Sequence, residues 1–400
     1  MPVSAVRAER YDRDLIRQAL KKAFSLLGMN PYNPFENLVF PGNQVFIKPN
    51  WVAHRYRASC PQQYDVYTTI THPFVIREVA GFVDKALGGR GKIIIGDNPS
   101  IDADFKALMA LQQLEDIQDE LRTPVSILDL RPLVCDDLGV YGQRDKMVSQ
   151  SGDPAGEATI NLGRESKLYG LNSRLFRGVF NEREETVRAH TGDTQLYSIS
   201  NSIFQSDVYI SVPKLKTHHK VGTTLNLKGL VGTMGTKNYL VHWREGFPAI
   251  GGDAYPNFWL WLLDRFRKVK KRGAWCGNDT IWRMVVDLYT VLQKGPKRFF
   301  SVVDGVLGGE GNGPFCPEPN HSGVLLAGTD LLETDIVASR LMGFKVEAIR
   351  YLDYYFQSKG FDKNKIEFKS DYVSPELLFD NSQHHLAFKP PTRWQQLIGD

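Results

Sequence analysis

Three consecutive isoleucines at residues 93–95 constrain the fold of this 400-residue chain more than any other feature. A run that is apolar at every position indicates a strand covered on both faces, as in a parallel sheet. Shorter apolar runs at 44–47 and 125–128 flank it, and helical patterns with one apolar face lie between the three runs. This order of strands and helices predicts an α/β fold: a doubly wound, mostly parallel sheet.

Further buried strands are expected at 208–212, 299–303 and 324–327, and an amphipathic helix at 11–27. Between the first two strands lies an aromatic and basic segment with two expected helices, near 257–268 and 279–292. We therefore expect an α/β core domain of residues 1–238 and 299–400, and a helical insertion of residues 239–298.

Composition excludes several classes of protein. Hydrophobic residues make up 42% of the chain and charged residues 24%, which is typical of a globular protein and excludes a mainly disordered one. The longest apolar stretch is too short to span a membrane, and the first residues lack the apolar core of a signal peptide. A net charge of +4 makes nucleic acid an unlikely partner.

Four cysteines are scattered along the chain, and no two of them form a CxxC pair. This spacing argues against disulfides and against a cysteine-only zinc or iron–sulfur site, so we expect free thiols and a cytoplasmic location. The residues concerned are Cys60, Cys135, Cys276 and Cys316.

Charged and polar side chains follow each expected strand at its carboxyl end, where open α/β sheets bind their ligands. We therefore expect these side chains to share one cleft. They are Lys48 and Asn50 after 44–47, Asp97 after 92–95, Lys214, Lys216, Thr217 and His218 after 208–212, Asp304 after 299–303, and Asp330 after 324–327.

The segment after residues 208–212 is the densest of these groups, and residues 208–244 contain five Lys, one Arg and no acid. Lysines suit carboxylate or phosphate, so Lys214, Lys216 and Lys228 are expected to bind an anion. Hydroxyl and amide groups of Thr217, Thr223 and Asn226 would add donors to the substrate site, alongside Lys48 and Asn50. A basic surface loop is the alternative interpretation.

Histidines 218 and 219 are adjacent, so in extended chain they point in opposite directions. We expect His218 to face the cleft as an acid/base, because it shares the parity of Lys214 and Lys216, while His219 faces away. The expected catalytic group consists of His218, Lys216 and Asp304.

Residues 303–314 contain five glycines but lead towards another strand, and no nucleotide-binding GxGxxG turn or P-loop is present. The sequence therefore has no NAD or ATP fingerprint. Asp304 and Glu310 could bind a divalent cation, with Asp97, Asp330 and Asp335 as further candidate ligands. A structural turn, and a helix cap in the case of Asp330, are the alternatives.

Several of these segments together resemble the domain of unknown function 362 family, in order from about residue 42 to 345. They are Val45-Phe-Ile-Lys-Pro-Asn50, Thr71-His-Pro73, Gly96-Asp97, Val212-Pro-Lys-Leu-Lys-Thr-His218, 223–232, Glu310-Gly-Asn-Gly-Pro314 and Gly328-Thr-Asp330. The resemblance implies a cytoplasmic α/β protein of unestablished activity. Many relatives carry a ferredoxin-like cysteine motif and are named iron–sulfur proteins. This chain has no CxxCxxC, so it resembles a branch without that motif.

The sequence predicts an enzyme of lyase, isomerase or hydrolase type that performs acid–base chemistry, with or without a metal, on a small anionic substrate such as a carboxylate, phosphate or acidic sugar. Hydride transfer fits less well, because no dinucleotide fingerprint is present. A non-catalytic module that binds an anionic metabolite or a cluster is the main alternative. A third is polyanion binding through the basic run 265–272, which is also explained by a solvated helix end.

Overall fold

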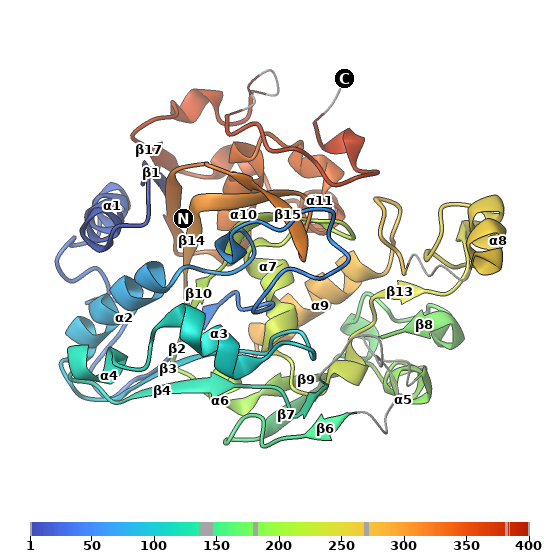
Figure 1. Cartoon of the computed structure of the whole chain (residues 1–400), viewed down its shortest axis with the longest axis horizontal. Helices are drawn as coiled ribbons and strands as arrows, with labels where there is room; N and C mark the ends of the chain where they lie inside the picture. Colours follow the sequence, from blue (N-terminus) through green and yellow to red (C-terminus); the bar gives the residue numbers. More distant parts are fainter. Residues whose placement is uncertain are drawn as a thin grey trace.

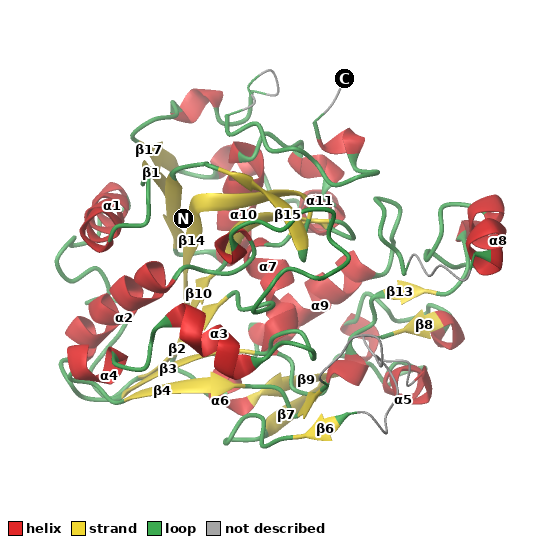
Figure 2. Cartoon of the chain, viewed as in Figure 1, coloured by secondary structure: helices red, strands yellow, loops and turns green. Residues whose placement is uncertain are grey.

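A computed structural model of the chain describes residues 2–135, 147–178, 183–267, 272–380, 383 and 385–398. Its centre is an 11-stranded sheet (Figures 1 and 2). Eight strands follow one another across it in the order β17 (Phe368–Ser370), β1 (Val3–Arg7), β16 (Val324–Gly328), β14 (Arg298–Asn312), β10 (Val208–Val212), β2 (Gln44–Pro49), β3 (Lys92–Asp97) and β4 (Val125–Asp129).

Strand direction confirms the expected mostly parallel α/β sheet. The ladders from β14 through β10, β2 and β3 to β4 are all parallel. Strand β16 runs antiparallel to both of its neighbours, β14 and β1. The six strands expected from apolar runs all form, whereas β1 was not predicted.

Alternating residues of the inner strands face two separate cores. Ile93 and Ile95 pack into one core and Ile94 into the other, which is the two-sided burial that the isoleucine run predicts. The first core holds α1 (Arg13–Leu26), α2 (Pro73–Leu87), α3 (Phe105–Gln112) and α4 (Ile117–Glu120). The second holds α7 (Leu225–Gly229), α9 (Ile281–Leu292), α10 (Leu331–Leu341) and α11 (Arg350–Lys359).

Three short strands extend the sheet beyond this path. They are β11 (Lys214–His218), β12 (Gly222–Thr223) and β15 (Cys316–Asn320). Strand β14 is far longer than the expected 299–303: its first half pairs with β10 and β16, and its second half with β11 and β15. The glycine-rich segment 303–314 is therefore mostly strand.

Smaller pairs of strands lie beside the main sheet. They are β5 (Leu133–Val134) with β6 (Val148–Ser149), β7 (Glu157–Asn161) with β9 (Leu196–Ser200), and β8 (Phe176–Arg177) with β13 (Trp243–Arg244). Helices α5 (Arg183–Ala189) and α6 (Asn201–Phe204) belong to the same part of the chain.

The segment 239–298 contains the two expected helices, α8 (Phe258–Phe266) and α9. They differ in setting, because α9 packs in the second core while α8 lies at the periphery, away from the central sheet (Figure 1). The domain division remains a prediction. The basic run 265–272 falls partly outside the described residues.

Cysteine pairing corrects one expectation. Cys60 and Cys316 form a disulfide with their Cα atoms 5.4 Å apart, whereas Cys276 is a free thiol. The partners are separated by 256 residues, so spacing along the sequence did not indicate the pair.

Among the described residues, no helix has both the length and the apolar character required to cross a membrane.

Candidate functional site

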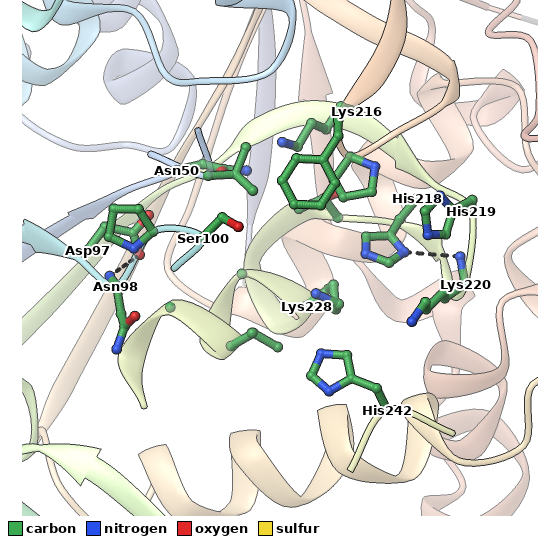
Figure 3. A pocket seen from close by; sticks show the side chains of 18 of the residues that line it. Asn50, Asp97, Asn98, Ser100, Lys216, His218, His219, Lys220, Lys228 and His242 are labelled. Carbon is green, nitrogen blue, oxygen red and sulfur yellow. Dashed lines mark hydrogen bonds between the residues drawn. The ribbon is translucent and has the colours of Figure 1, made fainter. Parts of the chain in front are cut away.

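A cavity of about 350 Å³ opens at the carboxyl ends of β2 and β3, beside β11 and α7 (Figure 3). This is the edge at which open α/β sheets bind ligands. Six residues expected from the sequence line it: Lys48, Asn50, Asp97, Lys216, His218 and Lys228. We call this cavity the cleft.

The lining of the cleft is strongly cationic. Of its described residues, five are lysines, two are arginines, three are histidines and one, Asp97, is a carboxylate. The cations and imidazoles that were not predicted are Arg57, His219, Lys220, Lys237, His242 and Arg272. Four of them fall within the acid-free stretch 208–244, beyond its obvious Pro-Lys-Leu-Lys-Thr-His motif.

Asp97, the cleft carboxylate, is already engaged. Its Oδ1 atom lies 2.8 Å from Lys48 Nζ, and its Oδ2 atom accepts a 2.7 Å hydrogen bond from the Trp51 backbone N–H. Gly232 packs directly against this pair, since a Cβ there would lie 2.0 Å from Oδ1. One cation is thus neutralised within the protein, and most of the remaining positive charge faces the cavity.

Lys216 reaches the cleft from β11 because that strand is irregular. Lys214 pairs with Asp304 in the ladder, but Lys216 pairs with Gly309, so the register shifts between them. Lys216 Nζ donates a 2.6 Å hydrogen bond to the Thr69 carbonyl. Burial, and then the charge of Lys228, lower its pKa well below the ordinary value.

Lys228 is presented by α7, which the carboxylate of Asp335 on α10 holds in place. Asp335 accepts hydrogen bonds of 2.8 and 2.9 Å from the backbone N–H groups of Asn226 and Leu227 at the start of α7. Lys228 is 7% exposed, and within the described part of the chain its ammonium has no hydrogen-bond or ion-pair partner. Burial, and secondarily Lys48, lower its pKa to about 8.

His218 has a defined tautomer. The Lys220 backbone N–H donates a 3.1 Å hydrogen bond to His218 Nδ1, so the neutral ring carries its proton on Nε2 (Figure 3). Burial, and then the charge of Lys228, lower the pKa of this imidazole well below its ordinary value. His218 is therefore a neutral N–H donor in the cleft.

His219 also lines the cleft, although it was expected to face away. Strand β11 ends at His218 and the chain turns at the next two residues, so the alternation of an extended strand no longer applies. The two imidazole rings lie edge to face, with centroids 5.3 Å apart.

Two further lysines have a pKa close to neutrality. Lys220 lies over the Trp243 ring at 4.6 Å, and burial followed by the charge of Arg272 lowers its pKa to about 7. Lys237 donates to the Asn98 carbonyl at 3.3 Å, and burial followed by the charge of Arg131 also lowers its pKa to about 7.

The disulfide joins two segments that line the cleft, those of Arg57 and Phe315. Arg57 stacks on the Phe315 ring at 3.4 Å, and both residues line the cavity. Cys60 and Cys316 link the two segments that carry them.

Asp304, expected to act as a catalytic residue at a strand end, lies instead within β14 and is fully buried. It accepts hydrogen bonds from Tyr11 Oη at 2.8 Å and the His72 backbone N–H at 2.9 Å, and its ion pair with Lys214 measures 3.0 Å. This network holds both Asp304 and Lys214 away from the cleft.

Asp330 lies at the opposite edge of the sheet. Because β16 is antiparallel to β14, its carboxyl end lies beside the amino end of β14, and there Asp330 caps α10 through the Glu333 N–H. The alternative of a helix cap is the one the structure supports.

The other predicted residues have structural partners outside the cleft. Glu310 binds Asn320 Nδ2 at 2.8 Å, Thr217 Oγ1 donates to the Gly311 carbonyl, Thr223 bonds the Tyr351 hydroxyl, and Asn226 bonds Asp335. The predicted metal ligands Asp97, Glu310, Asp330 and Asp335 are thus dispersed. The described residues contain no group of three or more His, Cys, Asp or Glu that could hold a metal ion.

Comparison with known proteins gives a family and distant relatives. A family described as "Domain of unknown function (DUF362)" matches residues 131–340, slightly more than half of the chain. A thylakoid-associated protein of Synechocystis is 22% identical over 346 residues, which cover 85% of this chain and 74% of that protein.

Two solved structures are also similar. A structural-genomics protein from Thermotoga maritima matches with a TM-score of 0.37 and 11% identity, over 78% of this chain and 55% of that one. The lactate racemase apoprotein of Thermoanaerobacterium thermosaccharolyticum matches with a TM-score of 0.30 and 13% identity, over 76% of this chain and 50% of that one. This chain thus spans about half the length of each.

Proposed function

This chain belongs to the DUF362 family, and from the geometry of its cleft we propose that it binds a small molecule carrying a carboxylate or phosphate and moves a proton on it. The observation that carries the proposal is the ammonium of Lys228, which is 7% exposed in a cationic cavity and has no hydrogen-bond or ion-pair partner among the residues that the structure describes. Keeping such a charge out of water is costly unless an anion approaches it.

The anionic part of the substrate is matched by several cations. Lys216, Lys220 and Lys228 line the cleft, and Asn50 lines it as well. Burial, and then neighbouring positive charge, lowers the pKa values of these lysines. An anion placed among them would stabilise their charged forms and raise those values, so binding would be accompanied by proton uptake.

The buried, cationic surroundings of Lys228 also favour proton transfer, because they lower its pKa. A lysine with a pKa of about 8 is largely protonated near pH 7 and acidic enough to give up its proton, so it is a competent general acid towards a bound substrate. We assign that role to Lys228. His218, fixed as a neutral ring with its proton on Nε2, would donate a hydrogen bond to the oxygen on which negative charge develops. The sequence had suggested His218 as the acid/base, and the bond from the Lys220 N–H favours this changed assignment.

A thermal-shift screen of small carboxylates and phosphates tests the binding half of the proposal. A ligand at a hundredfold excess over its Kd stabilises the fold by about 2.7 kcal/mol, which gives a clear rise in Tm. We expect Lys228→Met to abolish this rise. Lys92→Met is the matched control, because Lys92 is exposed at the far end of the strand that ends at Asp97. A ligand that stabilises the Lys228→Met variant as much as the wild type would refute the site.

Solvent exchange tests the catalytic half. The best ligand from the screen is incubated in D2O, and deuterium incorporation at carbon is followed by mass spectrometry. We expect incorporation with the wild type and a strong reduction with His218→Gln, which retains a side-chain N–H but not the ring geometry. A ligand that binds without any exchange or turnover would leave the non-catalytic binding module as the correct alternative.

The expected cytoplasmic location stays a prediction. The disulfide between Cys60 and Cys316 weighs against it, because such bonds persist mainly in oxidising compartments.

A further inference from the structure

Helix α8 has an unusual pattern of burial for a helix of a globular protein. Its one buried residue is an acid, Asp264, which is 4% exposed. Trp259 and Phe266 are 74% and 78% exposed. The helix therefore turns its acid inwards and large aromatic side chains outwards, at the periphery of the molecule (Figure 1).

The exposed apolar residues are on one face. Trp259, Leu263 and Phe266 are spaced i, i+4 and i+7, which aligns them along the helix. Phe258 extends the group, since its ring centroid lies 5.3 Å from that of Trp259. We call these four residues the aromatic face.

Positive charge adjoins the aromatic face. Arg265 and Arg267 are exposed at the carboxyl end of α8, and the Arg265 guanidinium lies over the Trp261 ring at 5.4 Å. Asp264 is the one acid within α8, and it is buried. The outer surface of the helix therefore combines apolar and cationic groups without an exposed carboxylate of its own.

We propose that α8 docks this protein on the surface of membranes that contain anionic lipids, with the aromatic face entering the headgroup region. Helices that lie in this region combine an apolar face with flanking Lys or Arg, and tryptophan favours the interface. A bilayer accepts a convex helix without a matching groove, and the arginines are complementary to lipid phosphates. A second copy of this chain would instead require an apolar surface shaped to receive the helix.

Vesicle co-sedimentation of the full chain tests the proposal. The probes are vesicles of phosphatidylcholine alone and of phosphatidylcholine with phosphatidylglycerol. We expect binding to the phosphatidylglycerol vesicles that weakens with added salt, because exposed charges are screened. The double variant Trp259→Glu/Phe266→Glu should bind at least about tenfold more weakly, since each large apolar side chain contributes a factor of this size.

The matched control is Tyr32→Glu, which changes an aromatic residue that is 65% exposed on a different part of the chain. It should bind vesicles as the wild type does. Since all three positions are exposed, each variant should keep the wild-type Tm, which excludes misfolding as the cause.

Three results would overturn the proposal: no binding of the wild type to either vesicle, equal binding by the Trp259→Glu/Phe266→Glu variant, or equal loss in the Tyr32→Glu control. Sedimentation analysis identifies the competing occupant. A wild-type dimer that becomes monomeric in the double variant, without vesicle binding, would assign the aromatic face to self-association.

Discussion

Replacing Lys228 by methionine should stabilise the ligand-free protein. The two side chains have similar length, and the side chain at position 228 is only 7% exposed. Burying the apolar methionine side chain stabilises the folded state, whereas burying the lysine ammonium destabilises it. The substitution removes a group placed for a ligand rather than for the fold, so stability rises as binding is lost.

The lowered pKa of Lys228 gives the size of the stabilisation expected for Lys228→Met. Its fall from 10.5 to about 8 corresponds to about 3 kcal/mol of penalty, at about 1.4 kcal/mol per pH unit. Because the folded-state pKa is the lower one, the full penalty acts below about pH 8. It is relieved progressively as the pH rises towards the unfolded-state value. The stabilisation should therefore be largest near pH 7 and should shrink to a small fraction near pH 10.5.

Denaturant unfolding of the wild type and Lys228→Met at several pH values measures this difference. We expect the free energy of unfolding of the variant to exceed that of the wild type by up to about 3 kcal/mol near pH 7. A variant that is less stable than the wild type at pH 7, or a difference that does not shrink with rising pH, would refute the reasoning.

Three further predictions concern the cleft and its surroundings. Anion binding should weaken as the pH rises above about 7, because Lys220 and Lys237 then lose the protons that the bound state requires; calorimetry across this range would show a constant Kd if this is wrong. Gly232→Ala should destabilise the fold by about 1–3 kcal/mol, since its Cβ would lie 2.0 Å from the cleft carboxylate. The control Gly81→Ala, with nothing within 4 Å in the middle of α2, should instead be stabilising in the same unfolding assay. Alkylation of the denatured chain should label Cys276 but neither Cys60 nor Cys316 before reduction, and all three after it; labelling of Cys60 and Cys316 before reduction would exclude the bond between them.

Local pattern predicted most of the sheet. The inner strands β10, β2 and β3 are short and largely apolar at consecutive positions. Neighbouring residues such as Ile94 and Ile95 therefore indicate burial on both faces of the sheet. Open α/β sheets bind ligands at the carboxyl ends of their strands, and this rule predicted three cleft residues at the ends of parallel strands, namely Lys48, Asn50 and Asp97.

The same rule failed where the chain departs from regular parallel strands. Asp304 was expected at a strand end, but β14 continues to Asn312 because β11 and β15 supply new hydrogen-bond partners. The parity of Lys214 and Lys216 did not place them together, since the register of β11 shifts between them.

By itself, the sequence determined where apolar strands and helices form, because those depend on the spacing of neighbouring side chains. It also determined that one stretch of the chain is rich in lysine and free of acids. Only the tertiary structure decided that β16 runs antiparallel, that Asp335 supports α7, and that the Lys228 ammonium lines the cleft with no partner in the described part of the chain. Those features depend on contacts between segments far apart in the chain, and the free energy of such contacts has no signature in the local pattern.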